Sequence, residues 1–109
     1  MIARHWRGWT TLANADEYEQ LLKGKVLPGL LSIAGYRGGY VLRFDGPNET
    51  EFVVINLFES LADVKAFAGD DYSVAVFEPE ARRLLARVEP TASHYDVRWS
   101  NPLADKGEG

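Results

Sequence analysis

The chain has 109 residues, of which 46% are hydrophobic, which suits one folded domain with its own core and excludes a disordered chain. Its formal net charge is -4 and its 12 Lys and Arg residues are scattered, which argues against a nucleic-acid partner, because a phosphate backbone is met by clustered basic residues. The absence of cysteine excludes a disulfide framework, a thiolate metal site and a thiol nucleophile.

The N-terminal residues predict a strand from Ile2 to Trp9. Trp6 and Trp9 lie among β-favouring neighbours, and the segment lacks the apolar core of a signal peptide. No stretch of the sequence approaches the roughly 20 apolar residues that a membrane-spanning helix needs. The simplest expectation is a soluble, cytoplasmic protein without a membrane partner.

A helix is predicted after this strand. Asn14 is placed as its N-cap, and Glu17 follows three residues later, as in a capping box. The expected buried face has apolar residues at helical spacing, namely Tyr18, Leu21, Leu22 and Val26. Pro28 and Gly29 should kink or end this helix, because proline lacks a backbone N–H and glycine readily adopts the terminating left-handed conformation.

A hairpin comes next, with strands from about Tyr36 to Phe44 and from Phe52 to Phe58 around the Asp-Gly-Pro-Asn turn at 45–48. The second of these strands is apolar on both faces, whereas a strand with one wet face should alternate apolar and polar residues. The chain is too short to cover both faces of its sheet. We therefore expect a second copy to cover one of them, in a homodimer.

The rest of the chain predicts two helical regions and a last strand. Ser60 and Asp63 cap a helix whose apolar face contains Leu61, Val64, Phe67 and Ala68, and Gly69 to Asp71 interrupt it. A short helical piece through Tyr72 to Phe77, a helix opened by Pro79 over Glu80 to Leu85, and a strand from Thr91 to Trp99 follow. Residues 1–99 thus form a single domain, and 100–109 form a flexible polar tail.

The resulting order is βαββαβ. It predicts an α+β, ferredoxin-like fold, in which a four-stranded antiparallel sheet carries both helices on one face. The opposite face is then free to meet the partner copy.

Several segments carry a family resemblance. The run from Phe52 to Ser60, followed by Val-Lys-Ala-Phe at 64–67, resembles the strand-then-helix signature of the antibiotic biosynthesis monooxygenase (ABM) superfamily of dimeric α+β barrels. Further similarity to small bacterial members lies in the segments 2–8, 35–38 and 94–97. The resemblance implies the fold and the homodimer. It leaves the activity open, because the superfamily includes monooxygenases, haem-degrading enzymes, isomerases and other proteins.

Two chemistries are implied by this resemblance. In the quinone-forming monooxygenases, which need no cofactor, a phenol is deprotonated between sheet and helices, and its carbanion passes an electron to oxygen; aromatic walls, a base and a positive or donor group are needed. In the haem-degrading branch, an Asn of the first strand, a Trp of the second helix and a His form the catalytic set. Here these positions hold Trp6, Phe67 and, near the third, Val76 and Phe77, which argues against haem degradation.

Arg4 and Trp6 share one face of the first strand, because side chains alternate with period two. Arg4 could hold an anionic substrate and Trp6 could stack on a ring. The alternatives are structural: Trp6 fills the core and Arg4 pairs with a carboxylate. Phe67 is the third candidate for the pocket wall.

Two histidines are candidates for proton transfer. His94 lies on the last strand, which should pair antiparallel with the first, and His5 points to the face opposite that of Arg4. Either could instead be a structural histidine. A metal site would need His5, His94 and Asp96 to converge, and no compact ligand motif supports one, so no metal and no cofactor are predicted.

Tyr72 and Asn56 complete the set. Tyr72 follows the helix break, so its phenol could donate to a substrate oxygen from a mobile segment, or its ring could simply anchor the loop. Asn56 needs a hydrogen bond if it is buried, to the backbone, which is favoured, or to a ligand. It shares a face with Phe52, Val54 and Phe58, so it joins the pocket only if that face is the helix side.

The hypothesis from these residues is a homodimeric, cofactor-independent monooxygenase that oxidises a small aromatic or polyketide-like substrate with O2. In it Trp6, Phe67 and Tyr72 wall the pocket, Asn56 contacts the substrate, Arg4 steadies an anionic oxygen and His94 handles the proton. The alternative is a non-catalytic dimeric module of the same fold that binds a small ligand or has a structural role. A closed core with Trp6 packed and no cavity between sheet and helices favours the module, and a pocket lined by Arg4, His94 and Tyr72 favours the enzyme.

Overall fold

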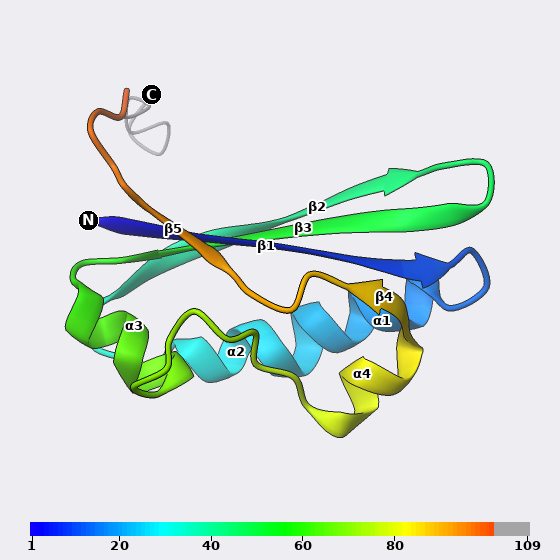
Figure 1. Ribbon diagram of the computed structural model, residues 1–109, viewed down its shortest axis with the longest axis horizontal. Coiled ribbons are helices and arrows are strands. Elements are labelled where there is room, and N and C mark those ends of the chain that lie inside the picture. Colours follow the sequence, from blue (N-terminus) through cyan, green and yellow to red (C-terminus); the bar gives the residue numbers. More distant parts are fainter. Residues whose placement is uncertain (102–109) are drawn as a thin grey trace, which may run out of the picture.

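One antiparallel sheet carries all the helices on one of its faces in the computed structural model, which describes residues 1–101 (Figure 1). This is the ferredoxin-like α+β architecture that the element order predicts. The tail expected over 100–109 lies, from residue 102 on, outside the described residues. No helix within 1–101 is long and apolar enough to cross a membrane.

The sheet has five strands, one more than expected. They are β1 (Ile2–Thr11), β2 (Tyr36–Asp45), β3 (Glu49–Phe58), β4 (Leu85–Val88) and β5 (Ser93–Asp96). The strand order is β2-β3-β1-β4, and β5 also pairs with β1. β3 runs antiparallel along the whole of β1, and the expected hairpin joins β2 to β3.

The extra strand arises because two short strands share the free edge of β1. β4 pairs with the segment around Trp9, and β5 pairs with Ile2 to His5. The single last strand expected from Thr91 to Trp99 is therefore wrong in its extent. β5 covers only part of that range, and β4 is a strand that the sequence did not predict; Pro90 separates the two, since it has no N–H with which to continue a ladder.

The first helical region is longer than expected. It runs without a break through α1 (Ala15–Leu21), the π-helical turn η1 (Leu22–Val26) and α2 (Leu27–Leu30). Pro28 and Gly29 lie inside its last turn, so the helix ends at Leu30, one residue beyond the predicted end. The Leu27 N–H donates to the carbonyl of Leu22, five residues back, and a new α-helical turn begins there in which Pro28 needs no N–H.

The capping box expected at the start of this region is also wrong. Asn14 occupies the N-cap but makes no side-chain cap bond, and its Nδ2 instead donates to the carbonyl of Leu84 at 3.3 Å. This long-range bond joins α1 to the last residue of α4 (Pro79–Leu84). Tertiary contact has replaced the local cap.

The second helical region follows the prediction in part. Ser60 caps α3 (Leu61–Ala68) by accepting from the Asp63 N–H at 3.4 Å, and Gly69, with a φ of 85°, ends it. Pro79 opens α4 as expected, and α4 ends one residue early because Leu85 begins β4. The helical piece expected between Tyr72 and Phe77 is wrong. There the Ala75 N–H donates to the carbonyl of Pro90, so this loop pairs with the β4–β5 connection.

The two faces of the sheet differ. On β3 the face of Phe52, Asn56 and Phe58 is buried beneath the helices, and the face of Val53 and Ile55 is only partly covered. The ring of Phe52 meets that of Tyr18 from α1 edge to face at 4.9 Å. Asn56 therefore lies on the helix side of the sheet.

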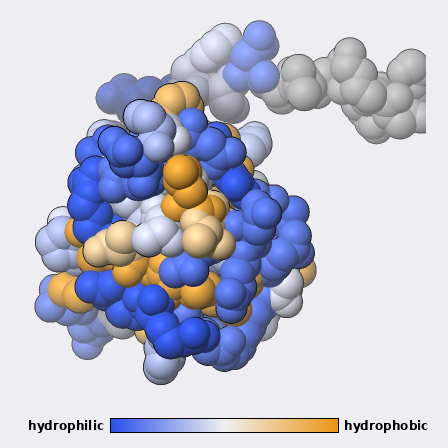
Figure 2. All heavy atoms as spheres, turned by 90° about the vertical axis from the view of Figure 1, so that its right-hand side faces the viewer, coloured by the Kyte–Doolittle hydropathy of each residue, from blue (hydrophilic) through white to orange (hydrophobic). Residues whose placement is uncertain are grey.

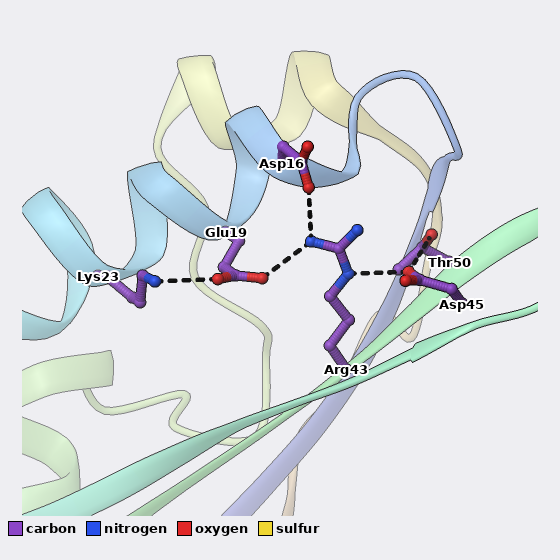
Figure 3. Close-up of polar contacts among 6 residues, drawn as sticks. All are labelled: Asp16, Glu19, Lys23, Arg43, Asp45 and Thr50. Carbon is purple, nitrogen blue, oxygen red and sulfur yellow. Dashed lines mark hydrogen bonds and ion pairs between the residues drawn. The ribbon is translucent and has the colours of Figure 1, made fainter.

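Charged residues secure the hairpin to the helical layer. Arg43 of β2 donates to Asp16 and Glu19 of α1 and to Asp45 at the strand end, at 2.8–2.9 Å (Figure 3). Seen from this end, the surface is mostly hydrophilic, with a small hydrophobic group near its centre (Figure 2). The hairpin end of the fold is therefore held by surface charge pairs as well as by the core.

Candidate functional site

A cavity of about 370 Å³ lies between the sheet and the helical layer. Four residues of its sheet wall come from two neighbouring strands as direct cross-strand pairs, Arg4 with Asn56 and Trp6 with Val54. Leu22 and Leu30 from the first helical region and Phe67 from α3 face them. The strand alternation of β1 and β3 thus places a cation, an amide and an indole on one wall.

Arg4 is buried, with 5% of its surface exposed. Its Nη1 donates to the carbonyl of Tyr72 at 2.5 Å and to Nε2 of His94 at 2.9 Å, and its Nη2 donates to the carbonyl of Val74 at 3.3 Å. All three acceptors are neutral, and no carboxylate within residues 1–101 forms an ion pair with Arg4. Burial lowers the pKa of this guanidinium from its usual value, although it stays protonated near neutrality.

His94 lies opposite Arg4 on β5, so the expected antiparallel pairing of the first and last strands is confirmed. Because a guanidinium only donates, Nε2 of His94 must accept, and in the neutral ring the proton therefore sits on Nδ1. Burial, and then the charge of Arg4, lower the pKa of His94 below its usual value. The imidazole is thus neutral near pH 7 and is engaged with Arg4.

Tyr72 and His94 lie behind Arg4 rather than on the cavity wall. The Tyr72 ring meets the imidazole edge to face at 5.1 Å, and its backbone carbonyl accepts from Arg4. Of the six residues singled out in the sequence, the structure brings Arg4, Trp6, Asn56 and Phe67 to the cavity, and it places these other two against the arginine.

Aromatic rings form much of the remaining wall. Trp6 donates from Nε1 to the carbonyl of Glu89 at 2.7 Å, and its ring meets Phe77 at 5.5 Å. Phe67 stacks on Phe58 at 6.3 Å and lies 5.4 Å from the Arg4 guanidinium carbon, within the range of a cation–π contact. Trp6 therefore packs as a core residue and also faces the cavity.

Asn56 is 6% exposed, and its Oδ1 accepts from the Tyr36 hydroxyl at 2.9 Å. The expected backbone partner is therefore wrong. The phenol reaches the amide because the β2–β3 register shifts between Tyr36 and Gly39, and the positive φ of Gly38, 98°, permits that bulge. Burial raises the pKa of the Tyr36 phenol, which keeps it a hydrogen-bond donor.

The cavity also has an ion pair at its edge, and the sequence analysis did not single out its residues. Nζ of Lys25, in the π-helical turn, is 3.3 Å from a carboxylate oxygen of Glu78 and 2.7 Å from one of Glu80. Lys25 and Glu78 both line the cavity. The pair could be found in the sequence only by knowing that the helix continues past Pro28 and faces the start of α4.

A metal site has no support in the geometry. His5 and His94 lie on opposite faces of the sheet, since His5 pairs with Ser93 and Arg4 with His94. Within 1–101 no three His, Asp or Glu side chains gather closely enough to hold a metal ion.

A second hollow, of about 490 Å³, lies at the hairpin end and includes Trp9, Phe44 and Glu49. It contains none of the six residues singled out in the sequence. The cavity of Arg4 is therefore the candidate site.

Solved structures resemble this fold over nearly the whole chain. One is the "putative antibiotic biosynthesis monooxygenase" of Bacillus cereus, with a TM-score of 0.65, 14% identity, and coverage of 96% of this chain and 98% of the other. Another, of the same description and from Deinococcus radiodurans, has a TM-score of 0.67, 12% identity, and coverage of 96% and 100%. The chain has their fold. The resemblance expected from its strand-then-helix segment is thus confirmed at the level of architecture.

The comparisons of sequence found no match. No family model matches the chain, and no curated protein matches it significantly. Identities of 12–14% carry a fold and not an activity, so the chemistry must be argued from the cavity.

Proposed function

We propose that the protein is a cofactor-independent monooxygenase that oxidises a small aromatic or polyketide-like molecule with O2 in the Arg4 cavity. The observation that carries the proposal is the cavity itself, whose wall combines the rings of Trp6 and Phe67 with a buried guanidinium. The fold is shared with two proteins described as putative antibiotic biosynthesis monooxygenases, which is in accord with it.

The reaction would begin with a deprotonated aromatic ring. Its carbanion passes an electron to O2, one oxygen atom ends as the new carbonyl of the product, and the other leaves as water. A ring methylene, CH2, plus O2 then gives C=O plus H2O. Arg4 would stabilise the negative oxygen of the ring, and the Asn56 amide, opposite Arg4 on β3, would donate to it.

The test is oxygen consumption with anthrone-type and hydroquinone substrates, without added metal or flavin. We expect turnover by the wild type and a loss of about a hundredfold or more in kcat/KM for Arg4→Met. Arg43→Met is the matched control, because Arg43 lies outside the cavity, and it should keep full activity. Substrate binding without any oxygen consumption would favour a non-catalytic ligand-binding module instead.

We also propose that two copies pair through the helix-free face of the sheet. That face carries the partly covered Val53 and Ile55 of β3, and beside them the exposed Tyr40 (61%), Leu42 and Phe44 (67%) of β2. Exposed apolar side chains gathered on one face are typical of an interface.

Sedimentation at micromolar concentration tests the pairing. Wild type should sediment as a dimer, and Leu42→Lys as a monomer. Leu31→Lys places the same charge on an exposed leucine after α2, on the helical side, and should leave the dimer intact. A monomeric wild type would contradict the proposal.

A further inference from the structure

We propose that the hydroxyl of Tyr18 is a second polar contact for the ligand of the cavity, and that it donates to a neutral oxygen, a carbonyl or a hydroxyl, at the end of the ligand remote from Arg4. The class of ligand is an elongated aromatic molecule with an oxygen at each end. That the ligand is aromatic and has one oxygen at Arg4 rests on the proposed function. The second oxygen is argued from Tyr18.

Tyr18 of α1 is a buried phenol without a partner in the described chain. It is 2% exposed and lines the cavity, and its hydroxyl makes no hydrogen bond to any residue within 1–101. The hydroxyl is not sealed in the core either, because the fully buried side-chain oxygen left without a partner in this range is Oγ1 of Thr10. The space that the Tyr18 hydroxyl reaches is therefore the cavity that its side chain lines.

The other polar side chains of the cavity wall are already engaged with residues of the chain. Hydrogen bonds or ion pairs hold Arg4, Trp6, Lys25, Ser32, Asn56 and Glu78. Among the described residues, Tyr18 is thus the polar side chain of this wall that has no such bond. A buried hydroxyl without a partner is unfavourable, so a ligand oxygen placed beside it is bound more tightly than a C–H group at the same place.

Tyr18 lies at the other end of the cavity from Arg4. Its ring meets that of Phe52 edge to face at 4.9 Å, and Phe52 pairs across the strands with Gly8. Gly8 is four residues from Arg4 along β1, which corresponds to about 13 Å at roughly 3.3 Å per residue. A ligand that contacts both side chains is therefore elongated.

The indole of Trp6 lies between these two ends. Its ring extends along β1 over Gly8, where a Cβ atom would collide with it. Because Trp6 also lines the cavity, it provides a flat apolar surface between the arginine and the phenol. An aromatic ligand that stacks on this surface presents one end to Arg4 and the other to Tyr18.

Tyr18 acts as a neutral hydrogen-bond donor. Burial raises the pKa of its phenol far above the usual value of 10.0, so the hydroxyl keeps its proton near neutrality. A protonated phenol donates to a carbonyl or a hydroxyl, and it does not serve as a base. Tyr18 is therefore a specificity-determining residue, and it takes no part in proton transfer.

Calorimetry with two biphenyls tests the proposal without turnover. 4,4′-Dihydroxybiphenyl has a hydroxyl at each end, and 4-hydroxybiphenyl has one hydroxyl. With wild type we expect the dihydroxy compound to bind about tenfold more tightly, as one buried hydrogen bond allows. Tyr18→Phe keeps the ring on Phe52 and removes the hydroxyl, so the affinities of this variant for the two compounds should agree within about twofold.

Tyr95→Phe is the matched control. It removes a phenol hydroxyl from an exposed residue of β5 that does not line the cavity, so it should keep the wild-type preference for the dihydroxy compound. Urea unfolding separates a ligand contact from a structural bond. Tyr18→Phe should be at least as stable as wild type, because within 1–101 its hydroxyl has no hydrogen bond to lose.

Four results would each overturn the inference: equal affinity of wild type for the two biphenyls, an unchanged preference in Tyr18→Phe, a clear loss of stability in Tyr18→Phe, or no binding of either compound. The result is separable from that of the oxygen test. A preference that depends on Tyr18, without oxygen consumption, would retain this inference and remove the monooxygenase. Oxygen consumption without that preference would do the reverse.

Discussion

Two arginines of the same sheet show how differently this fold treats a positive charge. Arg43 on β2 is exposed and meets three carboxylates, those of Asp16, Glu19 and Asp45 (Figure 3). Arg4 on β1 is buried and meets two carbonyls and an imidazole. Carboxylates thus neutralise Arg43, which water already solvates, whereas the buried Arg4 has no carboxylate partner among the described residues.

The two environments act on the pKa in opposite directions. Hydrogen bonds to Asp45, Asp16 and Glu19 raise the pKa of Arg43, and burial lowers that of Arg4. A charge held for structure is satisfied by its own chain, as Arg43 is. A buried charge left unsatisfied beside a cavity is a mark of a binding site, because its counter-ion can come from outside.

The largest effect should follow from giving Arg4 the carboxylate that Arg43 has. Asn56→Asp places one directly across β1 and β3 from Arg4, at a cross-strand distance that permits an ion pair. We expect the affinity for 4-nitrophenolate, a small and stable phenolate, to fall about a hundredfold, equal to about 3 kcal/mol. Calorimetry at a pH where the probe is ionised measures it.

Asn56→Leu is the control for that substitution, since it removes the amide and adds no charge. Loss of one donor should lower the affinity by about tenfold or less. If the aspartate and leucine variants lost equal affinity, the loss would come from the changed shape of the residue 56 side chain and not from a negative charge beside Arg4.

His94→Ala should have the next largest effect, because it removes one of three acceptors that orient Arg4. We expect about a tenfold loss of 4-nitrophenolate affinity, equal to about 1.4 kcal/mol, and recovery of most of it in His94→Gln. Equal losses in both variants would show that the imidazole acts in some other way than as an acceptor.

The stability of the protein should also depend on pH through His94. Its pKa is lowered in the folded state, so the folded protein binds the proton less readily than the unfolded chain does. The stabilisation is complete above the ordinary value of about 6.5 and is lost as the pH falls from there through the lowered pKa. Urea unfolding between pH 7 and pH 5 should show a steeper decline for wild type than for His94→Gln, and parallel curves would refute it.

A smaller effect is expected at the Lys25–Glu78 pair. Glu78→Gln removes a negative charge from the cavity lining and should strengthen 4-nitrophenolate binding by about threefold, a modest change because the pair is partly exposed. Glu80→Gln is the control, because Glu80 also pairs with Lys25 but does not line the cavity. If both variants gained the same affinity, the effect would come from Lys25, which loses a carboxylate partner in each, and not from the charge of the cavity lining.

Much of the site follows from rules that act over a few residues. Alternation along β1 puts Arg4 and Trp6 on one face, and antiparallel pairing of the strand ends brings His94 beside Arg4. The Ser60 cap and the Asp-Gly-Pro-Asn turn are equally local, and both are where the sequence predicts them. The local preferences of these residue types therefore predict the fold and four residues of the cavity wall.

What sequence reasoning missed depends on tertiary contacts. Pro28 is accommodated inside the helix after a π turn, Asn14 reaches Leu84 instead of capping its own helix, and residues 85–88 form a strand before Pro90 that was not expected. The Tyr36–Asn56 bond needs a register shift, and the neutrality of all three Arg4 acceptors needs the loop of Tyr72 laid against β1. No spacing in the sequence encodes these distances.

The smallest effect on the cavity is expected from Arg43→Met, which should leave the affinity for 4-nitrophenolate unchanged and alter only acid stability. Arg43 lowers the pKa of Asp45, and Lys23 and Arg43 lower that of Glu19, so these carboxylates stabilise the fold above their ordinary values of 3.8 and 4.5 and cease to as the pH falls below them. Wild type should be the more stable protein at pH 7, and in urea unfolding the difference between the two should shrink as the pH falls below these ordinary values. If Arg43→Met instead weakened the binding of 4-nitrophenolate as strongly as Arg4→Met does, the cavity would be sensing the overall field of the protein, and the distinction between a satisfied and an unsatisfied arginine would fail.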